Sequence, residues 1–108
     1  MFDLSNDPIV NIPIATPFDE LDLVDHDALS RNIERWKKTP ATGFLVGSQT
    51  GEEWFLSETE KLEIARTVGQ TLDASRTLIG GIDCPSVTET LRRAEAFADV
   101  GAEMVRIR

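Results

Sequence analysis

The sequence contains no tyrosine, one histidine, one cysteine and few aromatic residues, 6% of the total. The single cysteine, Cys84, cannot form a disulfide within the chain, and no histidine lies near it in the sequence to activate its thiol. The single histidine, His26, stands between two aspartates and has no second histidine with which to share a metal ion. We therefore interpret Cys84 as a small residue in a tight turn and His26 as part of a solvated helix terminus, and we expect no metal site.

Positive charge is scarce as well, since 11 lysines and arginines face 19 aspartates and glutamates, for a formal net charge of -8. A nucleic-acid duplex or an anionic membrane surface would on average repel such a chain. No apolar run approaches the roughly 20 residues that a membrane helix needs. The first residues, MFDLSNDP, are acidic and lack the apolar stretch of a secretory signal. The composition predicts a cytoplasmic protein that binds neither nucleic acid nor membranes.

What the sequence does contain is a regular alternation of short apolar runs and amphipathic segments. Apolar runs begin near residues 9, 43, 77 and 103. The segments between them carry helix signals, namely an N-cap at Asp25 and capping boxes that begin at Ser57 and Ser86. The order β-α-β-α-β-α-β predicts parallel strands joined by right-handed crossovers. Either an open doubly wound sheet or a portion of a (β/α)8 barrel would satisfy it, and both place ligands at the carboxyl ends of the strands.

The apolar spacing also predicts which side of each helix is buried. The expected buried residues of the three helices are Leu29, Ile33, Trp36, Leu62, Ala65, Val68, Leu91, Ala94 and Ala98. Lys37, Lys38 and Lys61 fall on positions expected to be exposed, away from the strand ends where a desolvated amine with a lowered pKa would form. The open edges of a four-stranded sheet need the rest of a barrel or a partner chain to cover them.

The most informative turn follows the second apolar run and reads GSQTGEE. Gly47 and Gly51 permit a tight bend, and the N–H groups and side chains between them could hold an anion. Glu52 and Glu53 stand where a phosphate loop would carry a lysine, so a single carboxylate is a better ligand than a phosphate. The alternative interpretation is a turn that satisfies its own backbone, with Glu52 as a structural acceptor.

Four segments carry a family resemblance. They are PIATPF at residues 13–18, the turn from Ser48 to Glu52, LSETEK at residues 56–61 and AEAFADVGA at residues 94–102. In this order and spacing they resemble the dihydrodipicolinate synthase / N-acetylneuraminate lyase family, over a stretch from about Ile9 to the last residue. The turn from Gly81 to Ser86 also resembles the branch of that family that cleaves 4-hydroxy-2-oxoglutarate.

The resemblance implies that residues 1–108 are the N-terminal part, the first βαβαβαβ portion or about half, of a single (β/α)8 TIM barrel domain. It further implies class I aldolase chemistry, in which a lysine on the sixth strand forms a Schiff base with pyruvate or another 2-oxo acid. A tyrosine on the fifth strand would relay protons. Both residues are expected beyond residue 108, so the chain itself is expected to supply no catalytic residue. No metal and no dissociable cofactor are implied, and family members are often homo-oligomers.

Carried over by residue, the resemblance implies that the turn from Ser48 to Gly51 binds the substrate carboxylate, with Thr50 as the binding hydroxyl. Gln49 stands where many members have the threonine or serine of a proton relay, and an amide is a poor proton shuttle. The turn is also one residue longer than the common form. Asp83 replaces a usual glycine, which could alter the shape or the charge of the pocket.

The last apolar run alternates with Arg106 and Arg108, so one set of side chains should face the barrel interior. Arg106 is a further candidate for substrate binding, because a guanidinium can grip a second carboxylate bidentately. The alternative is an ion pair with a neighbouring acid. Trp36 and Trp54 are expected to pack, although Trp54 could instead wall the pocket or an oligomer contact.

The resemblance therefore implies a lyase or synthase that forms a Schiff base with a 2-oxo acid, by aldol cleavage or by condensation. Gln49 and Asp83 leave a second function open, that of a family member that binds a 2-oxo acid without turnover. A third possibility is a half barrel that self-associates through its open sheet edges and has no enzyme activity.

Overall fold

The computed structural model describes residues 8–108, and there the predicted alternation of strands and helices is confirmed. The elements are β1 (Asn11–Pro13), α1 (His26–Trp36), β2 (Gly43–Val46), the short 3-10 helix η1 (Glu53–Phe55), α2 (Glu58–Thr71), β3 (Thr77–Ile82), α3 (Val87–Asp99) and β4 (Met104–Ile107). Of the first apolar run, only residues 11–13 pair with a neighbouring strand. Proline at position 13 leaves this pairing intact, because the next N–H, that of Ile14, donates to the carbonyl of Leu45 at 3.1 Å.

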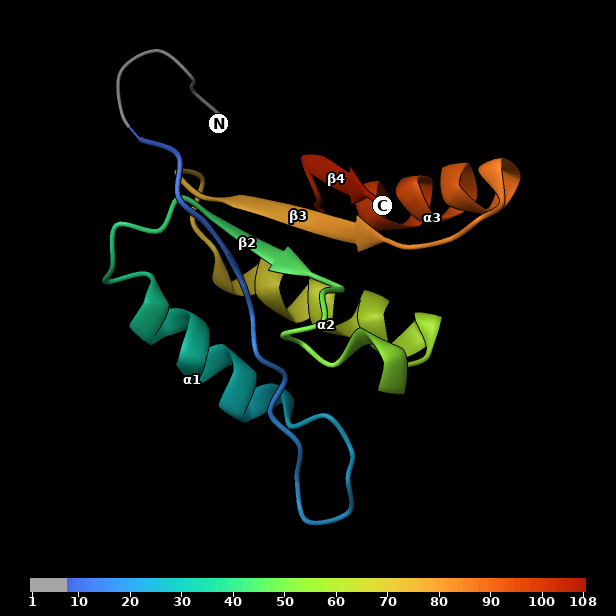
Figure 1. The fold of residues 1–108 in the computed structure, drawn as a ribbon. Helices are drawn as coiled ribbons and strands as arrows, with labels where there is room; N and C mark the ends of the chain where they lie inside the picture. The colour runs from blue at the N-terminus through green and yellow to red at the C-terminus, as the bar shows by residue number, and fades with distance from the viewer. Residues whose placement is uncertain (1–7) are drawn as a thin grey trace.

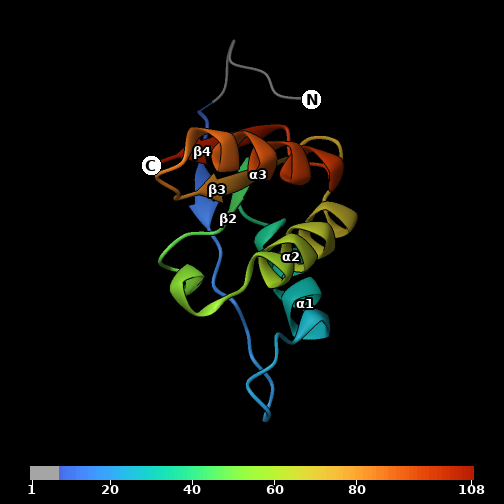
Figure 2. The same ribbon diagram turned by 90° about the vertical axis from the view of Figure 1, so that its right-hand side faces the viewer.

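All four strands are parallel and follow one another across the sheet in the order β1-β2-β3-β4. Figure 1 shows β2, β3 and β4 in succession, and Figure 2 shows α1, α2 and α3 following one another around one side of the sheet. An open doubly wound sheet would carry helices on both faces. Helices on a single face, with strands in sequential order, match a portion of a (β/α)8 barrel instead, whose other face is the barrel interior.

The hydrophobic core lies between the sheet and the helices. Its buried residues include, from the strands and their ends, Ile14, Phe44, Val46, Leu78 and Ile82 and, from the helices, Leu29, Ile33, Ile64, Ala65, Val68 and Phe97. Because side chains alternate along a strand, Leu45, Ile79 and Arg106 lie on the opposite, barrel-interior face. That face and its carboxyl edge are where a barrel of this kind places a ligand.

All three helices begin at the N-cap residues that the sequence predicts. The Asp25 carboxylate accepts a backbone N–H in the first turn of α1 at 2.9 Å. Ser57 and Glu60 form a complete capping box at the start of α2. These caps satisfy N–H groups that have no partner within their own helix.

Helix α3 begins at Ser86 as predicted, but its capping box is only half formed. The Ser86 hydroxyl accepts the N–H of Glu89 at 3.2 Å. The Glu89 carboxylate does not reach back, because it binds Arg92 and Arg93 on its own helix instead. The expected second capping box is therefore wrong in its second half, where ion pairing outcompetes the backbone.

The buried side of α3 is also different from the predicted one. Phe97 is buried, whereas Leu91 is 61% exposed and Ala98 is exposed, because no element within residues 8–108 covers that side of the helix. Phe97 packs against β3, where Gly80 has no side chain. A Cβ at Gly80 would lie 2.4 Å from Cγ of Phe97, so the glycine makes room for the ring.

The other two helices match the prediction more closely. In α1, Leu29 and Ile33 are buried, and Trp36 stacks on Phe44 with ring centroids 6.3 Å apart. In α2, Ala65 and Val68 are buried as expected, but the third buried residue is Ile64, and Leu62 is only half-buried.

Two of the lysines are less exposed than expected. Lys37 is half-buried, and its ammonium donates to the carbonyl of Thr71 at 3.0 Å. Lys61 is half-buried and pairs with Glu58 at 3.4 Å. Their aliphatic stems cover apolar surface while their charges stay paired. None of the helices in residues 8–108 has both the length and the apolar character needed to cross a membrane.

Candidate functional site

The candidate site lies at the carboxyl edge of the sheet, where the segments after β2 and β3 meet the end of β4. Gly47, directly after β2, has a φ of +88°, a conformation that favours glycine. A Cβ at Gly81 would lie 2.3 Å from the Gly47 carbonyl oxygen, and one at Gly47 would lie 2.8 Å from the Gly81 carbonyl oxygen. The two backbones therefore approach as closely as they do because neither residue has a side chain.

The turn that follows β2 is folded around the carbonyl of Ser48. This buried carbonyl accepts the N–H groups of Gly51 and Glu53, both at 3.1 Å. The hydroxyl of Thr16, in the loop after β1, donates to the carbonyl of Gly51 at 2.7 Å. The alternative interpretation, a turn that satisfies its own backbone, is therefore correct for the second half of the turn. The backbone groups there bind Ser48 and the loop after β1.

The tip of the turn is left open. Gln49 and Thr50 are exposed, and neither their side chains nor their backbone N–H groups donate a hydrogen bond to any residue in the range 8–108. The tip therefore presents two N–H groups, an amide and a hydroxyl to the space above the sheet. Such a set of neutral donors can bind a carboxylate.

The two acids behind the turn have different environments. Glu52 is exposed and lies in the left-handed region with a φ of 62°, whereas Glu53 is only 3% exposed. The Glu53 carboxylate accepts a hydrogen bond from Arg108 at 2.5 Å, and its other oxygen has no partner within residues 8–108. In the alternative interpretation Glu52 is the structural acceptor; in the structure the buried acid is Glu53, whose carboxylate pairs with the side chain of Arg108 and not with the turn backbone.

Arg108 also binds Asp83, with 2.8 Å between Nη2 and Oδ2. The hydrogen bond to Asp83 raises the pKa of the Arg108 guanidinium. One guanidinium therefore joins the end of β4, the loop after β3 and the 3-10 helix that follows the turn. The ion pair considered as an alternative for Arg106 is formed by Arg108 instead.

Arg106 lies on the same face of β4 as Arg108 but has different partners. It is opposite Gly81 in the strand register, and its Nη2 donates to the Gly47 carbonyl at 3.1 Å. Its Nε is buried without a partner, and Arg106 forms no ion pair within the part of the chain that the structure describes. Arg106 also lines a cavity of about 330 Å³ on the barrel-interior face, together with Asn11, Leu45, Ile79, Met104 and Val105.

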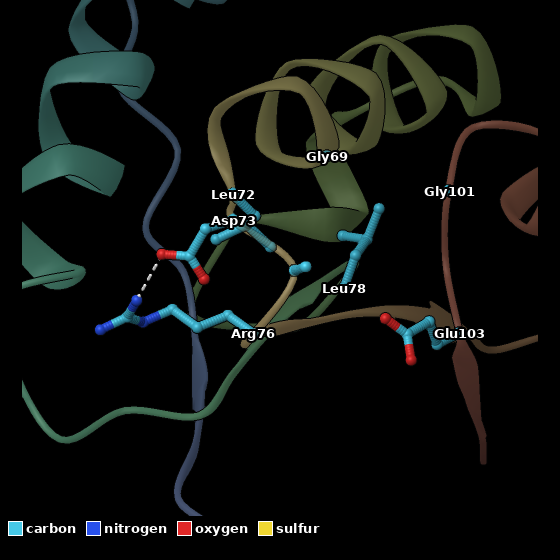
Figure 3. A pocket seen from close by; sticks show the side chains of 8 residues that line it. Gly69, Leu72, Asp73, Arg76, Leu78, Gly101 and Glu103 are labelled. Atoms are coloured by element: carbon cyan, nitrogen blue, oxygen red, sulfur yellow. Dashed lines mark hydrogen bonds and ion pairs between the residues drawn. The ribbon is translucent and has the colours of Figure 1, made fainter. Parts of the chain in front are cut away.

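A second hollow, of about 240 Å³, lies at the opposite, amino ends of the strands (Figure 3). The Asp73–Arg76 ion pair, at 2.7 Å, lines one side and Glu103 the other. Arg76 also donates to the carbonyls of Lys37 and Ala41, which ties the loop after α1 to the start of β3. Because this end of a (β/α)8 barrel carries stabilising contacts, we assign the hollow to structure rather than to catalysis.

The remaining residues considered from the sequence fall outside this edge or have structural partners. His26 is half-buried rather than solvated, since its Nδ1 hydrogen-bonds to Thr67 of α2 at 2.7 Å. Cys84 is half-buried and packs against the core. Trp54 is 68% exposed and does not pack within residues 8–108, contrary to the first expectation for it. No group of three His, Cys, Asp or Glu side chains in residues 8–108 is placed to hold a metal ion.

Sequence reasoning did not identify the supporting roles of Thr16, Glu53 and Gly81. Thr16 does belong to the quoted PIATPF segment, which is the signal that pointed toward it. Its partner lies 35 residues away, so no local pattern could name that partner. The choice between Glu52 and Glu53 depends on which side of the 3-10 helix faces Arg108, and that is a tertiary contact.

The amino-acid sequence matches a known protein family and several of its members. The sequence model of the dihydrodipicolinate synthetase family matches residues 9–107. Two curated relatives are 4-hydroxy-tetrahydrodipicolinate synthases. That of Lactobacillus helveticus is 30% identical over 87 residues, which cover 81% of this chain and 28% of the relative. That of Natronomonas pharaonis is 30% identical over 90 residues, which cover 83% of this chain and 30% of the relative.

Solved structures agree on the fold. A dihydrodipicolinate synthase from Bacillus anthracis superposes with a TM-score of 0.85 at 23% identity, over 97% of this chain and 35% of that one. The chain is therefore a partial (β/α)8 barrel. It spans about a third of the length of these relatives.

Proposed function

We propose, because the chain belongs to the dihydrodipicolinate synthetase family, that the full protein is a lyase or synthase that forms a Schiff base with pyruvate or a related 2-oxo acid. The observation that carries this proposal is the open tip of the turn after β2. There Gln49 and Thr50 present unpaired donors at the carboxyl edge of the sheet. In a (β/α)8 enzyme this edge is where substrates bind.

The chemistry of the tip favours a carboxylate over a phosphate. All of its free donors are neutral, and the exposed carboxylate of Glu52 follows it directly. A multiply charged phosphate would be repelled by that carboxylate more strongly than a singly charged carboxylate would. We assign the carboxylate next to the carbonyl of the 2-oxo acid to the donors of Gln49 and Thr50, with Ser48 and Gly51 shaping the turn.

The reaction itself needs groups that these residues do not supply. The half-buried ammonium of Lys37 is bonded to Thr71 and that of Lys61 to Glu58, both on the helices and not at a strand end. We therefore place the Schiff-base lysine and the proton-relay tyrosine beyond residue 108. Aldol cleavage and condensation pass through the same adduct, so both directions fit the proposal.

Assembly and location belong to the same proposal. We propose that the protein acts in the cytoplasm as a homo-oligomer. Trp54 and Phe55, which are 68% and 81% exposed on the 3-10 helix after the turn, are the residues we would first test for a contact between copies.

A second function is favoured by one observation, the side chain of Gln49. This amide has no hydrogen-bond partner within residues 8–108 and stands in the position where a hydroxyl relay would be expected. An amide can bind a carboxylate, but it transfers protons poorly. A family member with this residue could hold a 2-oxo acid without turning it over.

Borohydride trapping distinguishes the two functions. The natural full-length protein is incubated with pyruvate, reduced with borohydride and weighed intact, with a sample reduced without pyruvate as the control. A mass gain of one reduced pyruvate on a chain heavier than 12.0 kDa supports the Schiff-base enzyme. Saturable pyruvate binding without an adduct supports the non-catalytic binder. A natural protein of 12.0 kDa that self-associates and neither binds nor traps pyruvate would overturn both and leave the self-associating half barrel.

A further inference from the structure

Within residues 8–108, the guanidinium of Arg106 has no anionic partner at the edge of the candidate site. Two acids at this edge, Glu53 and Asp83, both bind Arg108, at 2.5 and 2.8 Å. Arg106 is left with one carbonyl, that of Gly47, as its hydrogen-bond partner within residues 8–108.

The surroundings of Arg106 hold it in a defined place. A Cβ at Gly81 would lie 2.9 Å from Nη2 of Arg106, so the guanidinium passes over a residue that has no side chain. The bond from Nη2 to Gly47, at 3.1 Å, then directs it toward the first residue of the turn. Its Nε is buried and has no hydrogen-bond partner within residues 8–108, which is rare in folded proteins.

Arg106 is joined to the turn through Gly47, which lies close to the open tip along the chain. Gln49 and Thr50 lie two and three residues beyond Gly47, which is at most about 7 to 11 Å of extended chain. Arg106 also lines the cavity of about 330 Å³ on the barrel-interior face, beside the apolar side chains of Leu45, Ile79 and Met104. A short molecule with an anionic group at each end matches the combination of neutral donors at the tip and a cation beside the turn.

We propose that Arg106 determines substrate specificity by binding a second carboxylate, so that the site selects dicarboxylic 2-oxo acids over monocarboxylic ones. This inference rests on the proposed function, in which the turn binds the first carboxylate. The second carboxylate takes the free guanidinium N–H groups of Arg106. The Nη2 atom of Arg108, by contrast, already pairs with two protein carboxylates, those of Glu53 and Asp83.

The test compares 2-oxoglutarate with 2-oxopentanoate, which has the same length but ends in a methyl group, and with pyruvate. Affinity is measured on the full-length protein by calorimetry, and adduct formation by borohydride trapping. Wild type should bind 2-oxoglutarate about 10- to 100-fold more tightly than 2-oxopentanoate, the range expected of a charged hydrogen bond. Arg106→Met should abolish this preference, so that 2-oxoglutarate and 2-oxopentanoate bind with similar affinity.

Two further variants keep the result interpretable. Arg92→Met removes an exposed guanidinium from α3, far in sequence from the site, and should leave the preference unchanged. Arg106→Lys keeps the charge without the bidentate geometry and should retain part of the preference, which covers the case in which Arg106→Met fails to fold.

Each failure points to a different claim. If wild type shows no preference, or Arg106→Met keeps it while pyruvate is still trapped, the specificity inference is wrong and the proposed function stands. If wild type neither binds nor traps any of the three acids, the proposed function fails and the inference fails with it.

Discussion

Arg108 and Glu53 lie 55 residues apart in the chain, yet Nη2 of the arginine is 2.5 Å from Oε1 of the glutamate. Glu53 is buried, and its backbone N–H is bonded to Ser48 at the start of the turn. Arg108 therefore supports the segment that we propose to bind substrate. Because Arg108 also holds Asp83, one guanidinium connects the segments after β2 and β3.

This connection makes the turn sensitive to Arg108. We expect Arg108→Met to increase the hydrogen-exchange rate of the peptide that covers Gly47 to Leu56, because Glu53 would lose its only ion-pair partner within residues 8–108. Mass-spectrometric hydrogen exchange on the full-length protein measures the change. Arg66→Met, on the exposed side of α2, is the control. Equal exchange rates in the two variants would show that the ion pairs of Arg108 do not order the turn.

Thr16 supports the same turn from the loop after β1. Thr16→Val removes the 2.7 Å hydrogen bond and leaves the carbonyl of Gly51 without that donor in a buried place. We expect a loss of about 1 to 3 kcal/mol in the free energy of unfolding, measured by urea denaturation. Thr88→Val, at an exposed position of α3, should change it by much less.

Thr50 is expected to act in binding rather than in folding. Thr50→Val removes an exposed hydroxyl that has no partner within residues 8–108, so the unfolding midpoint should stay close to that of wild type. The dissociation constant for pyruvate should rise about 2- to 10-fold, the equivalent of one neutral hydrogen bond. Thr59→Val, an exposed position of α2, is the matched control, and equal affinities for the two variants would remove Thr50 from the proposed site.

Gly80 and Phe97 form a contact that leaves no space for a side chain on β3. Gly80→Ala would place a Cβ 2.4 Å from the Phe97 ring, and overpacking of this kind costs about 1 to 3 kcal/mol. Phe97→Leu in the same molecule should recover part of that loss, because the smaller side chain can move away from the new methyl group. A double-mutant cycle measures the coupling, and strictly additive losses would contradict the proposed contact.

Glu89 gives stability a dependence on pH. Hydrogen bonds from Arg92 and then Arg93 lower the pKa of its carboxyl from 4.5 to about 2. When a carboxyl has a lower pKa in the folded state than in the unfolded state, its ionised form stabilises the fold at pH values above the unfolded-state pKa. This stabilisation is lost as the pH falls from the unfolded-state pKa to the folded-state pKa. We expect Glu89→Gln to be less stable than wild type at neutral pH, with the difference shrinking between pH 4.5 and about 2.

Urea unfolding over this pH range measures the effect of Glu89. Glu95→Gln is the control, because Glu95 is exposed on the same helix and forms no ion pair within residues 8–108. A difference between wild type and Glu89→Gln that does not change with pH would argue against the ion pairs as its source.

The sequence by itself determined the order of the elements, because the signals for it are local. Asp25, Ser57 and Ser86 cap helices a few residues away, and the apolar runs between them can be buried only as strands. Gly47 and Gly51 likewise marked the turn after β2, since a sharp bend needs residues of their kind within the turn itself.

Tertiary structure decided which side chains meet. Arg108 rather than Arg106 takes the two acids, Glu53 rather than Glu52 is buried, and Phe97 rather than Leu91 fills the space beside β3. Each outcome depends on residues that the sheet register brings together from distant parts of the chain. A periodicity shows which positions share a face, but the partner on the facing element is set by how strands and helices pack, and that contact has no local signature.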